Sequence, residues 1–132
     1  MVSQIMPRAT SAQRLPVLIV EDERSSRRAM AALLARCGFQ PAPFESAEEA
    51  LQAVLDGNHP RFALIDLDLP GMNGLDLISR LKSVDPAIFP ILITATDQEI
   101  LSDRLRDRPI TYLRKPVNFD TLLNLMTEQH RH

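Results

Sequence analysis

Four short apolar runs in this sequence each lead into polar side chains of the types that handle phosphate and metal ions. The runs are residues 17–20, 62–65, 91–93 and 111–114, and they lead into Glu21 with Asp22, into Asp66, into Thr94 and into Lys115, respectively. Apolar runs of this length, bounded by turn residues and separated by helical patterns, are typical of buried parallel strands. Ligands of an open α/β sheet bind outside the carboxyl ends of its strands. The sequence therefore predicts that three acids, a hydroxyl and a lysine meet in one pocket.

Three carboxylates in one pocket require a cation. Neighbouring strands lie less than about 5 Å apart, so acids at their ends are close. Two carboxylates about 4 Å apart repel by roughly 4 kcal/mol at an effective dielectric constant of about 20. Hard oxygen ligands suit Mg²⁺, which binds one or two carboxylates together with phosphate oxygens. With Lys115 as a positive charge and Thr94 as a hydroxyl donor, these residue types predict phosphoryl transfer to a carboxylate, with Asp66 at the centre.

The stretches between these runs carry helical patterns. The first stretch has one apolar stripe, which consists of Ala29, Met30, Leu33, Leu34 and Cys37. We expect the cysteine at the end of this stripe to be buried. Ser46 and Glu49 form a capping box for a second helix, and Thr96 with Glu99 resembles another. The helix expected after Thr96 has little apolar content, so we expect it to be the least firmly packed.

The alternation of strand and helix gives the fold class. Residues 39–44 read as the second strand, and Pro41 and Pro43 place it at a sheet edge because proline cannot donate a ladder hydrogen bond. Five strands and five helices in strict alternation predict an α/β three-layer sandwich with right-handed crossovers. We expect residues 1–14 to be a flexible lead-in, residues 15–129 to form one domain, and residues 130–132 to be a short tail.

Composition narrows the range of functions. The 132 residues carry a formal net charge of −2, and the arginines between the runs fit solvated helix faces, so we expect no direct binding of nucleic acid. No apolar stretch approaches the ~20 residues of a membrane span. A single cysteine excludes an internal disulfide and favours the cytoplasm.

Four segments in this order resemble the receiver domain of bacterial response regulators, over roughly Leu15 to Glu128. They are LIVEDE at 18–23, LIDLDLPGMNG at 64–74, ITA at 93–95 and YLRKP at 112–116. The resemblance implies a flavodoxin-like, five-stranded parallel sheet in the order 2-1-3-4-5, an order that the residue pattern alone does not give. It also implies a phosphoacceptor in a two-component phosphorelay, with a sensor histidine kinase or a histidine phosphotransfer protein as donor.

The resemblance assigns a role to each polar residue. Asp66 is then the phosphoacceptor, and Thr94 and Lys115 bind the phosphoryl oxygens. The ligands of Mg²⁺ (or Mn²⁺) are then the side chains of Asp22 and Asp66, the backbone carbonyl of Asp68, and Glu21 through water. Tyr112 matches the aromatic switch position that moves with Thr94. The Lys115–Pro116 bond is cis in this family.

Three positions depart from the usual family pattern or are individual to this chain. Glu21 replaces the commoner aspartate of the first acidic pair, and Arg108-Pro109 replaces the usual Gly-Ala before the fifth strand. We expect the second change to alter the loop before that strand. The side chain of Asp68 should lie on the route of the water that attacks the acyl phosphate, so we hypothesise that it sets the lifetime of the phosphorylated state.

Two alternatives remain at this point. Asp66 and Asp68 after an apolar strand resemble the acid pair of haloacid-dehalogenase-type phosphatases, although that pair usually follows the first strand of a longer chain. The other alternative is a receiver-like binding module that never carries phosphate. We expect a signalling phosphoacceptor rather than an enzyme, a monomer or weak homodimer, and a downstream protein partner of unknown identity.

Overall fold

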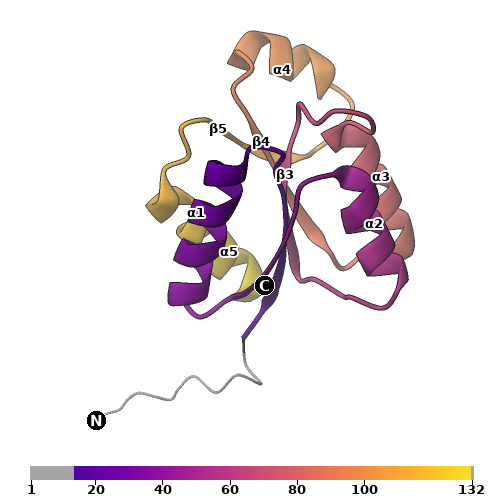
Figure 1. The fold of residues 1–132 in the computed structure, drawn as a ribbon. Helices are drawn as coiled ribbons and strands as arrows, with labels where there is room; N and C mark the ends of the chain where they lie inside the picture. The colour runs from indigo at the N-terminus through magenta and orange to yellow at the C-terminus, as the bar shows by residue number, and fades with distance from the viewer. Residues whose placement is uncertain (1–13, 132) are drawn as a thin grey trace.

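A five-stranded parallel sheet forms the centre of the computed structural model, which describes residues 14–131 (Figure 1). The strands are β1 (Pro16–Val20), β2 (Gln40–Phe44), β3 (Phe62–Asp66), β4 (Phe89–Thr94) and β5 (Thr111–Arg114). The helices are α1 (Arg24–Arg36), α2 (Ala47–Leu55), α3 (Gly74–Val84), α4 (Gln98–Arg104) and α5 (Phe119–Arg131). The strand order β2-β1-β3-β4-β5 confirms the predicted flavodoxin-like architecture.

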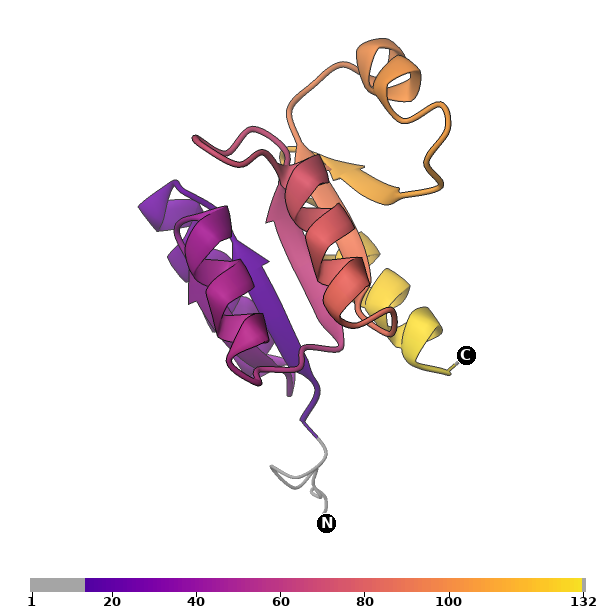
Figure 2. The same ribbon diagram turned by 90° about the vertical axis from the view of Figure 1, so that its right-hand side faces the viewer.

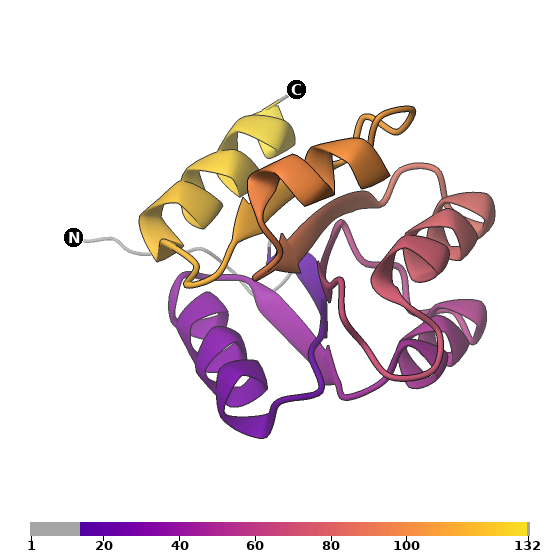
Figure 3. The ribbon, with the colours of Figure 1, turned by 90° about the horizontal axis from the view of Figure 1, so that it is seen from above.

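The helices form a layer on each face of the sheet. Figure 3 shows α1 and α5 on one face and α2 and α3 on the other. The sheet divides the apolar core accordingly, with Ile19 and Leu64 facing α1 and α5, and Leu18 and Ile65 facing α2 and α3. Helix α4 instead lies beyond the carboxyl ends of the strands (Figures 1 and 2). No helix within residues 14–131 has the length and apolar character needed to cross a bilayer.

Strand β3 occupies the middle of the sheet, and all five of its residues are buried. Strand β2 lies at one edge, as its prolines predict, because their missing N–H groups need no partner there. The ladder also continues past the strand ends. Leu67 N donates to Ile93 O at 2.9 Å, and Lys115 N donates to Thr94 O at 2.8 Å. These bonds hold the residues that follow β3 and β5 beside the end of β4.

Side-chain caps define where most helices begin. Ser46 Oγ accepts from Glu49 N at 3.1 Å, which confirms that Ser46 caps α2 as the first predicted capping box requires. The second prediction is wrong, because α4 begins at Gln98 and the preceding residue, Asp97, makes no side-chain cap bond. Thr96 is used differently, since its backbone N donates to Thr94 Oγ1 at 3.0 Å. The chain therefore turns around the end of β4 before the helix starts.

The stripe on α1 is only partly buried. Leu34 is fully buried, but Ala29 and Cys37 are exposed, so the expectation of a buried cysteine is wrong. Cys37 is the C-cap residue, and its N–H turns back to the carbonyls of the last helical turn. It therefore lies past the part of the stripe that contacts the sheet. At the other end of the chain, α5 runs to Arg131, while residues 1–13 and 132 of the predicted lead-in and tail lie outside the described residues.

Candidate functional site

Three acids converge at the carboxyl end of the sheet. Glu21 and Asp22 follow β1, and Asp66 is the last residue of the neighbouring strand β3. Glu21 and Asp66 are buried, whereas Asp22 is exposed. One carboxylate oxygen from each acid lies within 4.8 Å of the others. Because all three offer hard oxygen ligands at this spacing, the cluster fits a divalent cation such as Mg²⁺.

Lys115 bridges the two buried acids. Its Nζ lies 3.2 Å from Glu21 Oε1 and 3.2 Å from Asp66 Oδ2. Burial acts to lower the pKa of Lys115, but the negative charges of Asp66 and Glu21 outweigh it and raise that pKa above its usual value, so the amine stays protonated. One ammonium does not neutralise three carboxylates. The remaining negative charge favours a bound cation.

Glu21 is buried beside another negative charge, which disfavours its ionised form. Burial raises its pKa, the charge of Asp66 raises it further, and the hydrogen bonds from Glu23 N and Lys115 offset only part of this effect. Glu21 Oε2 accepts from Glu23 N at 3.0 Å, so both of its carboxylate oxygens have donors. Its longer side chain thus reaches Lys115 and its own loop at once.

The carboxylate of Asp66 is held at both oxygens. Oδ1 accepts from Asp68 N at 3.1 Å, and Oδ2 faces the Lys115 ammonium. Across the ladder, Thr94 is completely buried at the end of β4. Because Thr94 Oγ1 accepts from Thr96 N, its hydroxyl proton remains available for donation. The site thus offers an oriented carboxylate beside an ammonium, with a hydroxyl donor at the end of the neighbouring strand.

The remaining predicted residues lie around this centre. Asp68 is exposed in the loop after β3 and donates its backbone N–H to Asp66. The Lys115–Pro116 peptide bond is cis, as the resemblance implied. Tyr112 does not join the acids, because its side chain is half-buried against the apolar cluster on the α2 and α3 face.

Two features fix the path of the loop that joins β3 to α3. A Cβ atom on Gly74 would lie 2.6 Å from Asp66 O and 2.9 Å from Leu67 Cα, so only glycine lets α3 begin this close to Asp66. Glu48 Oε2, from the first turn of α2, accepts from Met72 N at 3.1 Å. The sequence pattern showed these residues only as a turn glycine and a capping-box neighbour, and it gave no sign that they support the site.

Two charged residues after Asp22 also have structural roles that the sequence did not reveal. Glu23 caps α1, since its carboxylate accepts from Ser26 N at 2.8 Å and Ser25 N at 3.2 Å, and these bonds lower its pKa. The spacing of an acid before two serines is a usable signal for such a cap. Arg27, which read as part of a solvated face, folds back onto the carbonyls of Glu21 and Asp22.

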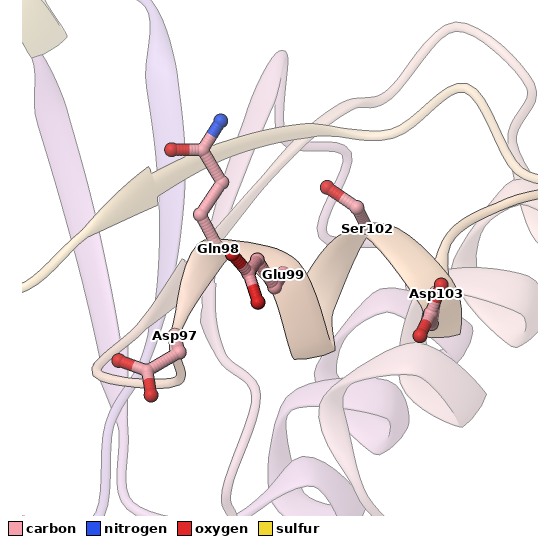
Figure 4. A pocket seen from close by; sticks show the side chains of 5 residues that line it. All are labelled: Asp97, Gln98, Glu99, Ser102 and Asp103. Atoms are coloured by element: carbon pink, nitrogen blue, oxygen red, sulfur yellow. The ribbon is translucent and has the colours of Figure 1, made fainter.

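Two hollows bear on the search for a binding site. One of about 310 Å³ runs between α1 and the start of α5, with Glu21 and Lys115 at one end and apolar side chains such as Met30 and Phe119 along it. The other, of about 920 Å³, lies over α4 and is lined by acids and neutral polar groups (Figure 4). Only the first contains residues of the acid and lysine cluster.

Comparison with known proteins shows the family to which this chain belongs. The family profile of the response regulator receiver domain matches residues 17–127. This chain belongs to that family. The matched range includes Glu21, Asp66 and Lys115, and the resemblance seen in the sequence is confirmed. The receiver domain of two-component response regulators accounts for the site, and neither the phosphatase nor the phosphate-free binding module is favoured.

The curated relatives of this chain are larger proteins, and the chain matches only a part of each. The chain is 37% identical over 110 residues to the two-component response regulator PhoP of Pseudomonas aeruginosa, covering 82% of the chain and 48% of PhoP. It is 31% identical over 121 residues to the transcriptional regulator NtrC of Escherichia coli, covering 91% of the chain and 26% of NtrC. A cyclic di-GMP phosphodiesterase of Thermotoga maritima is 32% identical over 109 residues, which are 82% of the chain and 29% of that protein. The chain thus spans at most about half of these relatives.

Solved structures show the same fold. The response regulator TrrA of Thermotoga maritima, in complex with Mg²⁺ and BeF, has a TM-score of 0.73 and 27% identity, with 87% of this chain and 98% of TrrA covered. A CheY-like receiver domain protein from Methanospirillum hungatei has a TM-score of 0.79 and 24% identity, with coverage of 89% and 98%.

Proposed function

We propose that this receiver domain accepts a phosphoryl group on Asp66 in a Mg²⁺-dependent step, and that phosphorylation changes a surface that binds a downstream protein. The observation that carries the proposal is the Asp66 carboxylate held between Lys115 Nζ at 3.2 Å and Asp68 N at 3.1 Å, with Thr94 buried at the end of the neighbouring strand β4. A histidine kinase or a histidine phosphotransfer protein is the donor that fits this acceptor.

The transfer itself needs few groups. An oxygen of Asp66 attacks the phosphorus, the bond from phosphorus to the donor imidazole nitrogen breaks, and the leaving nitrogen takes up a proton from solvent water. Because the attacking carboxylate and the phosphoryl group are both anionic, positive charge must be present before they meet. The Lys115 ammonium supplies one such charge, and the Thr94 hydroxyl donates a hydrogen bond to a phosphoryl oxygen.

The acids that would hold the metal are those that meet at the end of the sheet. Asp22 and Asp66 would bind Mg²⁺ (or Mn²⁺) directly, Asp68 through its backbone carbonyl, and Glu21 through water. A bound divalent cation supplies the positive charge that offsets the phosphoryl oxygens. The solved structure of TrrA in complex with Mg²⁺ and BeF supports Mg²⁺ as the metal for a receiver domain with the same fold.

The proposal is tested by intact-mass spectrometry after incubation with a small phosphodonor such as acetyl phosphate. We expect the mass of one phosphoryl group to be added with Mg²⁺ and to be absent with a chelator. Asp66→Asn should add nothing, whereas the matched variant Asp68→Asn removes a nearby carboxylate and should still be phosphorylated. Steady turnover of a phosphate ester would contradict the signalling role and favour a phosphatase.

We also propose that Asp68 sets the lifetime of phospho-Asp66. Its side chain is exposed at the mouth of the site, and its backbone N–H holds the acceptor carboxylate, so it lies where water must approach. The carboxylate either repels or orients that water. The half-life of phosphorylated Asp68→Asn, measured by loss of the added mass, should differ from that of the wild-type domain, and an unchanged half-life would remove this role.

The readout that we propose passes through Thr94 and Tyr112. Thr94 moves toward the phosphoryl oxygens, and Tyr112, now half-buried against the core, follows into the space that Thr94 leaves. The face made by α4, β5 and α5 then changes.

The domain acts in the cytoplasm as a monomer or weak homodimer, and its own residues bind neither DNA nor a membrane.

A further inference from the structure

Arg27 is the one arginine of α1 whose guanidinium hydrogen-bonds to backbone carbonyls among the described residues. Its Nη1 donates to Glu21 O at 2.9 Å and to Asp22 O at 3.3 Å, and the side chain is half-buried. Arg24 and Arg28, on the same helix, are exposed. Arg27 therefore differs from its neighbours in position, although the sequence shows only a run of basic residues.

The location of this cation is unfavourable for the helix alone. The amino terminus of a helix carries a partial positive charge, so a cation is normally better placed at the carboxyl terminus. Arg27 lies in the second turn of α1 and reaches back over the start of the helix to the loop that precedes it. Its contacts with two carbonyls, rather than helix stability, account for this conformation.

The two carbonyls belong to the peptide groups on either side of the Asp22 Cα. By binding both, Arg27 fixes the backbone of Asp22 and hence the direction of its side chain. Asp22 needs this support, because within residues 14–131 its carboxylate has no hydrogen bond or ion pair, whereas Lys115 and backbone N–H groups hold Glu21 and Asp66. Asp22 is also the exposed member of the acid cluster.

We propose that Arg27 is a positioning residue for the metal site, which orients the carboxylate of Asp22 by holding the two peptide groups that flank it. The inference rests on the proposed Mg²⁺ site. It assigns to Arg27 no contact with the metal or the phosphoryl group. Outer residues that orient metal ligands affect affinity strongly, and their loss typically weakens binding by about 10- to 100-fold.

The direction of the change in Mg²⁺ affinity distinguishes a positioning role of Arg27 from a purely electrostatic one. Removing a positive charge near a cation site should, by electrostatics alone, tighten the binding of Mg²⁺. Loss of the positioning contacts should weaken it. Arg28→Gln makes the same charge change one residue away on an exposed side chain, so it measures the electrostatic effect by itself.

The test is a calorimetric titration of the full chain with Mg²⁺. We expect about 10-fold weaker binding for Arg27→Gln, and partial recovery for Arg27→Lys, which keeps a donor and the charge. We expect unchanged or slightly tighter binding for Arg28→Gln. In phosphorylation by acetyl phosphate, Arg27→Gln should raise the Mg²⁺ concentration for half-maximal rate while the rate at saturating Mg²⁺ stays near wild type. Equal affinities for the two glutamine variants would overturn the inference.

A metal-free readout separates this inference from the proposed function. In the protein without Mg²⁺, the carbonyl ¹³C resonances of Glu21 and Asp22 should shift in Arg27→Gln and stay in place in Arg28→Gln. Unshifted resonances would show that the contacts do not form, and would overturn the inference even if the domain is phosphorylated. A wild-type chain that binds no Mg²⁺ would instead overturn the proposed function, and the positioning role with it.

Discussion

The acid site at the end of β3 and the helix α4 beside it are held to the molecule in different ways. Asp66 ends a fully buried central strand, and backbone and ammonium donors fix both of its carboxylate oxygens. Helix α4 has seven residues, no side-chain cap, and a single buried residue, Leu101. The residue before it, Asp97, forms an exposed pair with Arg114 of β5 at 3.7 Å, which contributes at most about 1 kcal/mol.

This difference shows how one event can act on two regions. A firmly held carboxylate gives the phosphoryl group a defined position, while an element with few buried contacts opens at low free-energy cost. Phosphorylation can shift such an element only by as much as its contacts with the two states differ in energy. Because α4 is weakly attached, only a small difference in energy is needed to shift it. The predictions below test whether the two regions really differ in this way.

Removing the ammonium should have the largest effect on the site. In Lys115→Met, phosphorylation by acetyl phosphate should slow by at least about 100-fold, because a lost charge-stabilising group typically costs that much or more. The rate of phosphoryl incorporation measures it. Lys82→Met is the control, since Lys82 is bound to loop carbonyls at the opposite end of α3. A comparable loss in both variants would mean that the site has no special dependence on Lys115.

Truncation of one leucine in each region should separate their packing. Leu81→Ala, in the buried face of α3, should lower the free energy of unfolding by about 3 kcal/mol. Leu101→Ala should lower it by only about 1 kcal/mol, because α4 detaches locally instead of leaving a cavity. Chemical denaturation measures both. Equal losses would show that α4 is as firmly packed as α3.

The close approach of α3 to β3 is tested by a single methyl group. Gly74→Ala should destabilise the domain by about 2 kcal/mol, since its Cβ would meet backbone atoms that cannot move aside easily. It should also slow phosphorylation, because Asp66 O is the nearest of those atoms. Ser79→Ala, at an exposed position of the same helix, is the control for stability. A fully stable and active Gly74→Ala domain would mean that this contact does not position Asp66.

The smallest effect concerns the Glu23 cap and depends on pH. Hydrogen bonds from Ser26 N and Ser25 N lower the pKa of Glu23 from its ordinary value of 4.5, so the folded state binds this proton less tightly than the unfolded state. Its stabilising contribution is therefore present above pH 4.5 and is lost as the pH falls through the lowered pKa. The melting temperature of Glu23→Gln should lie below that of the wild type at pH 7, and the difference should shrink toward pH 3. A difference that is independent of pH would contradict the cap.

The sequence predicted the firmly held region better than the weakly held one. Buried strands with polar ends are local patterns, so β1, β3 and β4 followed from the residues. The meeting of Lys115 with the acids at the ends of β1 and β3 followed from them too, while the strand order came from family resemblance. The cap of α4 was placed at Thr96, because the pattern does not show that its N–H is already taken by Thr94 Oγ1. The prediction that Cys37 is buried was wrong, because periodicity does not show where a helix leaves the sheet. Arg27 was missed because composition records a charge and not the direction in which its side chain folds.

The most direct test of the account is hydrogen exchange on the domain with and without beryllofluoride and Mg²⁺, a stable mimic of phospho-Asp66. The account predicts changed protection of the amides of α4, with those of α2 unchanged. It also predicts that Asp66→Asn abolishes the response. Unchanged exchange in α4, or the same change in Asp66→Asn, would contradict the claim that chemistry at Asp66 is read out through the weakly attached helix.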